Sequence, residues 1–160
     1  MTSRRMMSAA ALAVAVVAAT TAPVFADFSK SVTGSFKGQV VISKDELPVG
    51  KNDKDTVAKI KKAQIKELTG APTGEDVQGW NFHYTAFLSK TGASKLKMEF
   101  YNGKQLAADK TLDGIDPKSA VLTGDISINE DEGLAKGNTY TVQLVNGSGA
   151  VVAKTTLLMK

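Results

Sequence analysis

The stretch "GLAKGNTYTV", residues 133–142, carries the clearest fold signal in the chain. Leu134, Gly137 and Tyr140 stand three residues apart, and from Tyr140 onward apolar residues alternate with polar ones through Val142 and Leu144. Alternation with a period of two is typical of a β-strand with one buried face. The stretch therefore predicts a corner of the chain that leads directly into a strand whose apolar side chains lie in the core.

The same alternation recurs along most of the chain. Residues 36–43 and 95–101 read as strands, and Asn102-Gly103 is a strong hairpin signal after the second of them. Residues 80–88 place their apolar and polar members on opposite faces. One face holds Trp80, Phe82, Tyr84, Ala86 and Leu88, and the other holds Asn81, His83, Thr85 and Phe87. Short strands separated by turn residues, about seven in all, predict an antiparallel β-sandwich over residues 36–160.

One segment has the helical period instead. In residues 53–69, Val57, Ile60, Ile65 and Leu68 fall within one broad sector of a helical wheel, and lysines fall opposite. We therefore expect one amphipathic helix over about residues 53–69, inserted between the first two strands.

The corner motif carries a family resemblance. A leucine, a turn residue and a tyrosine at this spacing resemble the tyrosine corner of immunoglobulin and fibronectin type III sandwiches. The resemblance covers roughly residues 79–158 and implies that the Tyr140 hydroxyl bonds to nearby backbone while its ring fills the core. It also implies structural roles for Trp80, Leu134 and Gly137. Val142 stands where the antibody type has a cysteine. In general character the chain also resembles exported bacterial proteins without assigned roles, a likeness that implies no activity.

The first 26 residues predict a cleaved secretory signal peptide. Arg4 and Arg5 precede an apolar run from Met6 to Ala19, and Val24-Phe25-Ala26 provides small residues at a signal peptidase site. The run is shorter than the roughly 20 residues that span a bilayer, which argues against a retained anchor. The arginine pair also permits a twin-arginine export signal. We therefore expect a periplasmic or secreted protein that has no membrane span once the leader is cleaved.

Cleavage changes the composition of the chain. Both arginines would leave with the leader, so 20 basic residues become 18, all lysine, against 16 acidic ones, a net charge of +2. The chain contains no cysteine, so packing alone must hold it together. Residues 27–35, which are mostly polar, read as a flexible leader ahead of one domain of ordinary size.

Residues for catalysis or metal binding are scarce. His83 is the only histidine, and there is no cysteine, no G-x-S-x-G and no H-E-x-x-H pattern. The carboxylates of residues 129–133 permit a calcium site, but their spacing differs from that of an EF-hand loop. His83 either belongs to a Ser-His-Asp catalytic set or has a structural role. We predict a non-enzymatic protein that binds no cofactor.

The remaining candidates form a possible binding surface. Lys59, Lys62 and Lys66 are spaced to share a helix face, and Phe87 and Tyr101 lie opposite the predicted core side of their strands. The lysines either bind an anionic polymer or simply keep the outer helix face soluble. The lack of arginine argues against nucleic acid. The sequence predicts a binding or interaction module for an envelope or extracellular protein, or alternatively for polysaccharide or anionic envelope polymer.

Overall fold

The part of the chain that the structure describes is mainly β, as the alternation predicts. This computed structural model describes residues 27–74 and 76–160, so the predicted signal peptide lies outside the described residues. The strands are β1 (Gln39–Ser43), β2 (Glu67–Leu68), β3 (Ala71–Pro72), β4 (Gln78–Phe87), β5 (Leu96–Asn102), β6 (Gln105–Leu112), β7 (Val121–Asn129), β8 (Thr139–Asn146) and β9 (Val151–Met159). The helical segments are α1 (Lys30–Ser35), α2 (Asp53–Ala63) and the 3-10 turn η1 (Glu130–Glu132).

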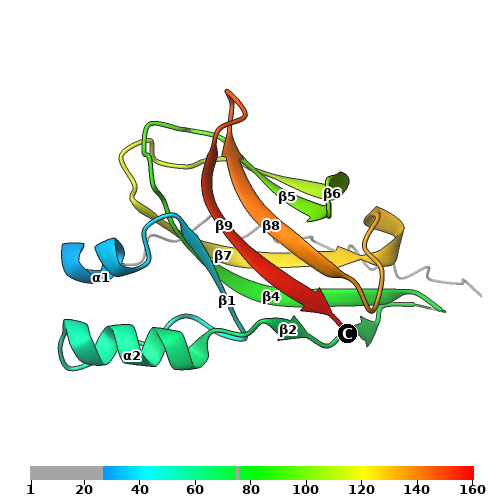
Figure 1. The fold of residues 1–160 in the computed structure, drawn as a ribbon, viewed down its shortest axis with the longest axis horizontal. Helices are drawn as coiled ribbons and strands as arrows, with labels where there is room; N and C mark the ends of the chain where they lie inside the picture. The colour runs from blue at the N-terminus through cyan, green and yellow to red at the C-terminus, as the bar shows by residue number, and fades with distance from the viewer. Residues whose placement is uncertain (1–26, 75) are drawn as a thin grey trace, which may run out of the picture.

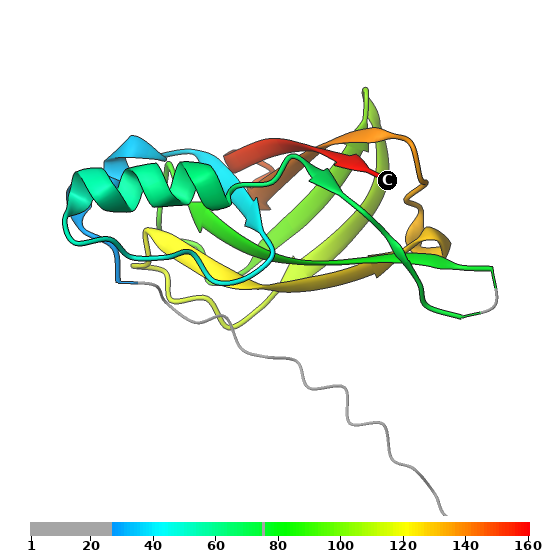
Figure 2. The same ribbon diagram turned by 90° about the horizontal axis from the view of Figure 1, so that it is seen from below.

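All nine strands belong to one curled, mixed sheet (Figures 1 and 2). Its main path runs β3-β4-β1-β9-β8-β5-β6, with β7 paired to β4 and β2 paired to β9. β9 is parallel to β1 and β2, and the other pairs are antiparallel. The prediction of about seven antiparallel strands in an immunoglobulin-like sandwich is therefore corrected. The pairing of β1 with both β4 and β9 joins into one sheet the strands that a sandwich would divide between two.

The inner face of the curl holds the larger core. Trp80, Phe82, Tyr84 and Ala86 of β4 all point into it, as the period of two predicts, and Trp80 is fully buried. The other main contributors come from β5, β8 and β9 and include Met98, Phe100, Val142, Leu144 and Leu157. Because this core draws on strands from both ends of the sheet path, it holds the curl closed on itself.

Residues 133–139 form a tight corner that leads into β8. Tyr140 is buried, and its hydroxyl accepts a hydrogen bond of 2.8 Å from the backbone N–H of Ala135. Leu134 is buried beside it, and Gly137 has a φ of +87°, a conformation that favours glycine. The likeness to a tyrosine corner is therefore confined to these residues, because the surrounding strands form one sheet and not the two sheets of a sandwich.

A second, smaller core lies on the outer face of β1, β4 and β7. In place of the flexible leader expected for residues 27–35, α1 packs Val32 and Phe36 onto this face. Phe87 is completely buried there, with its ring 5.1 Å from that of Phe36 and 5.6 Å from that of Phe28. The prediction of an exposed Phe87 is therefore wrong, because α1 covers the side of β4 that points away from Trp80.

α2 lies beside α1 and covers the outer face of β1 (Figures 1 and 2). It ends at Ala63 rather than near residue 69. Beyond it the backbone N–H of Ile65 donates to the carbonyl oxygen of Ile42, and Lys66 is hydrogen-bonded to the β9 backbone. Hydrogen bonds to the sheet thus replace those that a longer helix would make. Within the described residues, no helix has the length and apolar character needed to cross a membrane.

Candidate anion-binding pocket

The three lysines predicted to share a helix face do not do so. Lys59 lies on α2 and forms an ion pair of 3.3 Å with Asp55, one turn earlier. Lys62 is in the last turn of the helix, and Lys66 lies beyond its end, on the segment that leads into β2. All three are exposed. Because one is paired and another has left the helix, these lysines present no common unpaired face.

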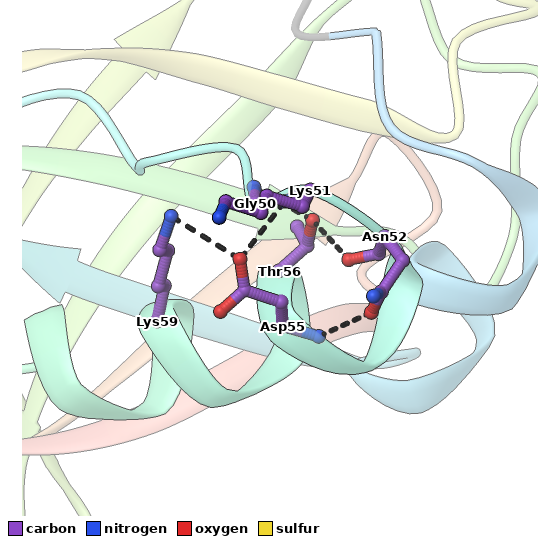
Figure 3. Close-up of polar contacts among 6 residues, drawn as sticks. All are labelled: Gly50, Lys51, Asn52, Asp55, Thr56 and Lys59. Carbon is purple, nitrogen blue, oxygen red and sulfur yellow. Dashed lines mark hydrogen bonds and ion pairs between the residues drawn. The ribbon is translucent and has the colours of Figure 1, made fainter.

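Figure 3 shows the polar contacts of residues 50–59, at the start of α2. The Asn52 side chain accepts from the backbone N–H of Asp55, and the Asp55 carboxylate accepts from the backbone N–H of Lys51. The hydroxyl of Thr56 donates to the Asn52 carbonyl and accepts from the Gly50 N–H. The backbone hydrogen bond from Lys51, followed by the Lys59 ammonium, lowers the pKa of Asp55. These contacts are a helix cap.

The two aromatic candidates are not neighbours in one patch. Phe87 is buried beneath α1, whereas Tyr101 is half-buried on β5, where it pairs across the sheet with Leu106 of β6. Partial desolvation, followed by the nearby Glu99 carboxylate, raises the pKa of Tyr101. Leu106 is 44% exposed, so this part of the sheet is open to solvent.

His83 belongs to a hydrogen-bonded row on the outer face. Its Nδ1 is 2.9 Å from a carboxylate oxygen of Asp125, and its Nε2 is 2.5 Å from the Thr123 hydroxyl, which lies 3.4 Å from that of Thr85. Because a carboxylate only accepts, the proton in the contact with Asp125 lies on Nδ1. The order matches an acid–base–nucleophile set, yet Thr123 is 6% exposed and lies directly opposite Thr85 in the pairing of β7 with β4. The row satisfies buried polar groups, which is a structural role.

Side chains of the acidic segment 129–133 also form hydrogen bonds and an ion pair with other residues of the protein. The Asn129 and Glu132 side chains form a capping box around η1, Glu132 pairs with Lys110, and Glu130 accepts from the backbone N–H of Gln78. Among residues 27–74 and 76–160 there is no group of three or more histidine or acidic side chains arranged to hold a metal ion.

A hollow in the described part of the chain lies where α1, the turn that follows it and two loops meet. Its volume is about 610 Å³. It is bounded by α1 with the turn that follows it, the loop from β4 to β5, and the loop from β6 to the start of β7. The lining residues are Phe28, Lys30, Thr33, Gly34, Lys37, Leu88, Ser89, Lys90, Thr91, Ser119, Ala120 and Val121.

All charged side chains that line this pocket are positive. Lys30, Lys37 and Lys90 line it, no acidic residue does, and none of the three lysines forms an ion pair within the described part of the chain. The nearby Asp116 carboxylate accepts from the backbone N–H of Lys118 in its own turn. Three like charges around one concavity create a positive potential that attracts anions.

The rest of the lining combines hydroxyls with an apolar floor. Thr33, Ser89, Thr91 and Ser119 supply hydroxyl groups, and the Ser89 hydroxyl donates to the Val152 carbonyl at 2.9 Å. The floor consists of the half-buried Phe28 with the buried Leu88 and Val121. The pocket is thus able to hold an anion that carries an apolar portion.

Sequence reasoning missed this pocket because its lysines are far apart in the chain. Lys30 begins α1, which reads as polar leader, Lys37 lies in the segment that reads as the first strand, and Lys90 lies in a loop after β4. The apolar spacing of Phe28, Val32 and Phe36 was the available signal, since residues four apart share a helix face. No known family model matches the chain, and comparison with curated proteins finds no match either.

Proposed function

We propose that this is an exported, non-enzymatic binding protein that holds an anionic ligand in the pocket between α1 and the two neighbouring loops. The observation that carries the proposal is the set of three lysines, Lys30, Lys37 and Lys90, around a hollow without acidic lining. What distinguishes these three lysines from other lysines without an ion pair in the described part of the chain, such as Lys61 and Lys62, is that they line one hollow together.

Export rests on the leader pattern of residues 1–26, and the absence of a catalytic role rests on the structural position of His83. Candidate ligands in an envelope or extracellular setting are anionic polymers and their acidic building blocks. Both present the negative charge that the lysines attract.

The test is calorimetric titration of the protein lacking residues 1–26 with small aromatic anions: benzoate, phenyl sulfate and phenyl phosphate. Benzyl alcohol serves as the neutral comparison. The variant Lys30→Gln/Lys37→Gln/Lys90→Gln should lose at least about tenfold in affinity, because each hydrogen bond to a charged group contributes about 1.5–3 kcal/mol before screening by solvent.

The matched control is Lys61→Gln/Lys62→Gln/Lys66→Gln. It makes the same change in net charge at exposed lysines that do not line the pocket. We expect it to bind as the parent protein does. Equal losses in the two triple variants would show that only net charge matters and would overturn the proposal.

A further variant keeps every lysine. Gly34 lines the pocket within α1, and a Cβ placed there meets no other atom within 4 Å. Gly34→Glu therefore brings a carboxylate to the lysines without a clash and replaces a helical glycine, which stabilises a helix by about 0.5–1 kcal/mol. The expected result is weaker anion binding with undiminished stability.

A further inference from the structure

We infer that the anionic group held in this pocket is a phosphate monoester joined to an apolar body, an inference that rests on the proposed function. The positive charge around the pocket comes from separate parts of the chain. Lys30 comes from the first turn of α1, Lys37 from the turn into β1, and Lys90 from the loop after β4, so the three lysines line the pocket from three separate segments.

Three ammonium groups suit an anion with several charged oxygens. A carboxylate has two oxygens and one negative charge. A sulfate ester has three terminal oxygens but still one charge. A phosphate monoester has three acceptor oxygens and a charge of about −1.5 to −2 at pH 7, which matches the lysine set most closely.

The neutral groups of the lining agree with this assignment. Thr33, Thr91 and Ser119 place hydroxyl donors in the same pocket as the lysines. Hydroxyl groups donate readily to phosphate oxygens, and lysine binds phosphate as a point charge. No lining residue is a carboxylate that would repel the second negative charge of the phosphate.

The apolar portion of the ligand is inferred from Phe28. Its ring lines the pocket and is held against Phe87 with the ring centres 5.6 Å apart. Leu88 and Val121 lie in the same lining and are almost wholly buried, so among these large apolar side chains Phe28 is the most accessible. A free inorganic phosphate would leave this surface in water.

The test exploits the second ionisation of a phosphate monoester, whose pKa is about 6. Between pH 7.5 and pH 5.0 the dianion falls from about 97% to about 9%, so the affinity for phenyl phosphate should fall by up to about tenfold, towards the affinity of a singly charged ester. Phenyl sulfate keeps one charge throughout, and its affinity reports any change in the protein itself. Circular dichroism at both pH values confirms that the fold is retained.

At pH 7.5 we expect phenyl phosphate to bind more tightly than phenyl sulfate, benzoate or inorganic phosphate. Phe28→Ala should weaken phenyl phosphate about fivefold or more and leave inorganic phosphate unchanged, because only the former has a ring to contact. Equal affinity for phenyl sulfate and phenyl phosphate at pH 7.5 would overturn the inference and leave the proposed function standing. Failure of every anion to bind would overturn both.

A second experiment distinguishes a lipid headgroup from a soluble phosphate ester as the ligand. Sedimentation with phosphatidylcholine vesicles containing phosphatidic acid presents the same phosphate monoester on a lipid surface. Vesicle binding that is lost in Lys30→Gln/Lys37→Gln/Lys90→Gln assigns a lipid headgroup. Binding of phenyl phosphate without vesicle binding assigns a soluble phosphate ester, and both results support the inference.

Discussion

Replacing Phe87 by alanine tests the packing of α1 on the sheet, on which the pocket depends. The ring is completely buried and lies against the rings of Phe36 at 5.1 Å and Phe28 at 5.6 Å. Truncation of a buried phenylalanine costs about 3–5 kcal/mol, from lost transfer free energy and the cavity left behind. For a domain of this size we expect the melting temperature to fall by roughly 10–20 °C.

The assay is thermal and urea unfolding followed by circular dichroism, with Tyr101→Ala as the matched aromatic control. Tyr101 is only half-buried on the uncovered part of the sheet, so its truncation should cost less than about 1 kcal/mol. A double-mutant cycle with Phe36→Ala should give a coupling of about 0.5–1.5 kcal/mol for the ring pair. A loss at Phe87 no larger than that at Tyr101 would refute the packing of α1 described above.

Three further predictions concern single residues. Tyr140→Phe removes the acceptor for the Ala135 N–H and should lower the free energy of unfolding by about 1 kcal/mol; an unchanged denaturation midpoint would contradict the corner. Asn52→Ala removes the α2 cap and should cost about 1 kcal/mol in urea unfolding, against no loss for Asn52→Asp. Burial, followed by the Asp125 charge, raises the pKa of Tyr84 to about 12. Stability should therefore decline from pH 10 towards pH 12, where the unfolded phenol ionises first, and Tyr84→Phe should flatten that decline in alkaline melts.

The strands were predictable from the sequence because their alternation reflects a core on one side. Trp80, Phe82 and Tyr84 were assigned to the inner face, and all three are buried there. Which strands pair was not predictable in the same way. The parallel contact of β1 with β9, which turns the predicted sandwich into one curled sheet, joins Gln39 to Lys154, and no local pattern encodes so distant a pairing.

The end of α2 shows how tertiary contacts override local preference. Residues 64–69 continue the helical period, yet Ile65 donates to β1 and β2 pairs with β9. The prediction that Phe87 is exposed was wrong for a related reason. Its position in the alternation was assigned correctly to the face opposite Trp80, but that face becomes a second core only because α1 covers it. A pattern within one strand cannot reveal what packs on its outer side.

The pocket is inseparable from this second core. Lys30 and Lys37 are carried by α1 and the turn after it, and α1 is held to the sheet by Val32 and Phe36. On the proposed function, an anion that bridges these lysines to Lys90 would stabilise the docked position of α1, and loosening of α1 would separate the three lysines. By linkage, a ligand at 100 times its dissociation constant adds about 2.7 kcal/mol to the free energy of unfolding, comparable with what Phe87→Ala removes. Residues 28–37 thus contribute to both the second core and the lining of the pocket.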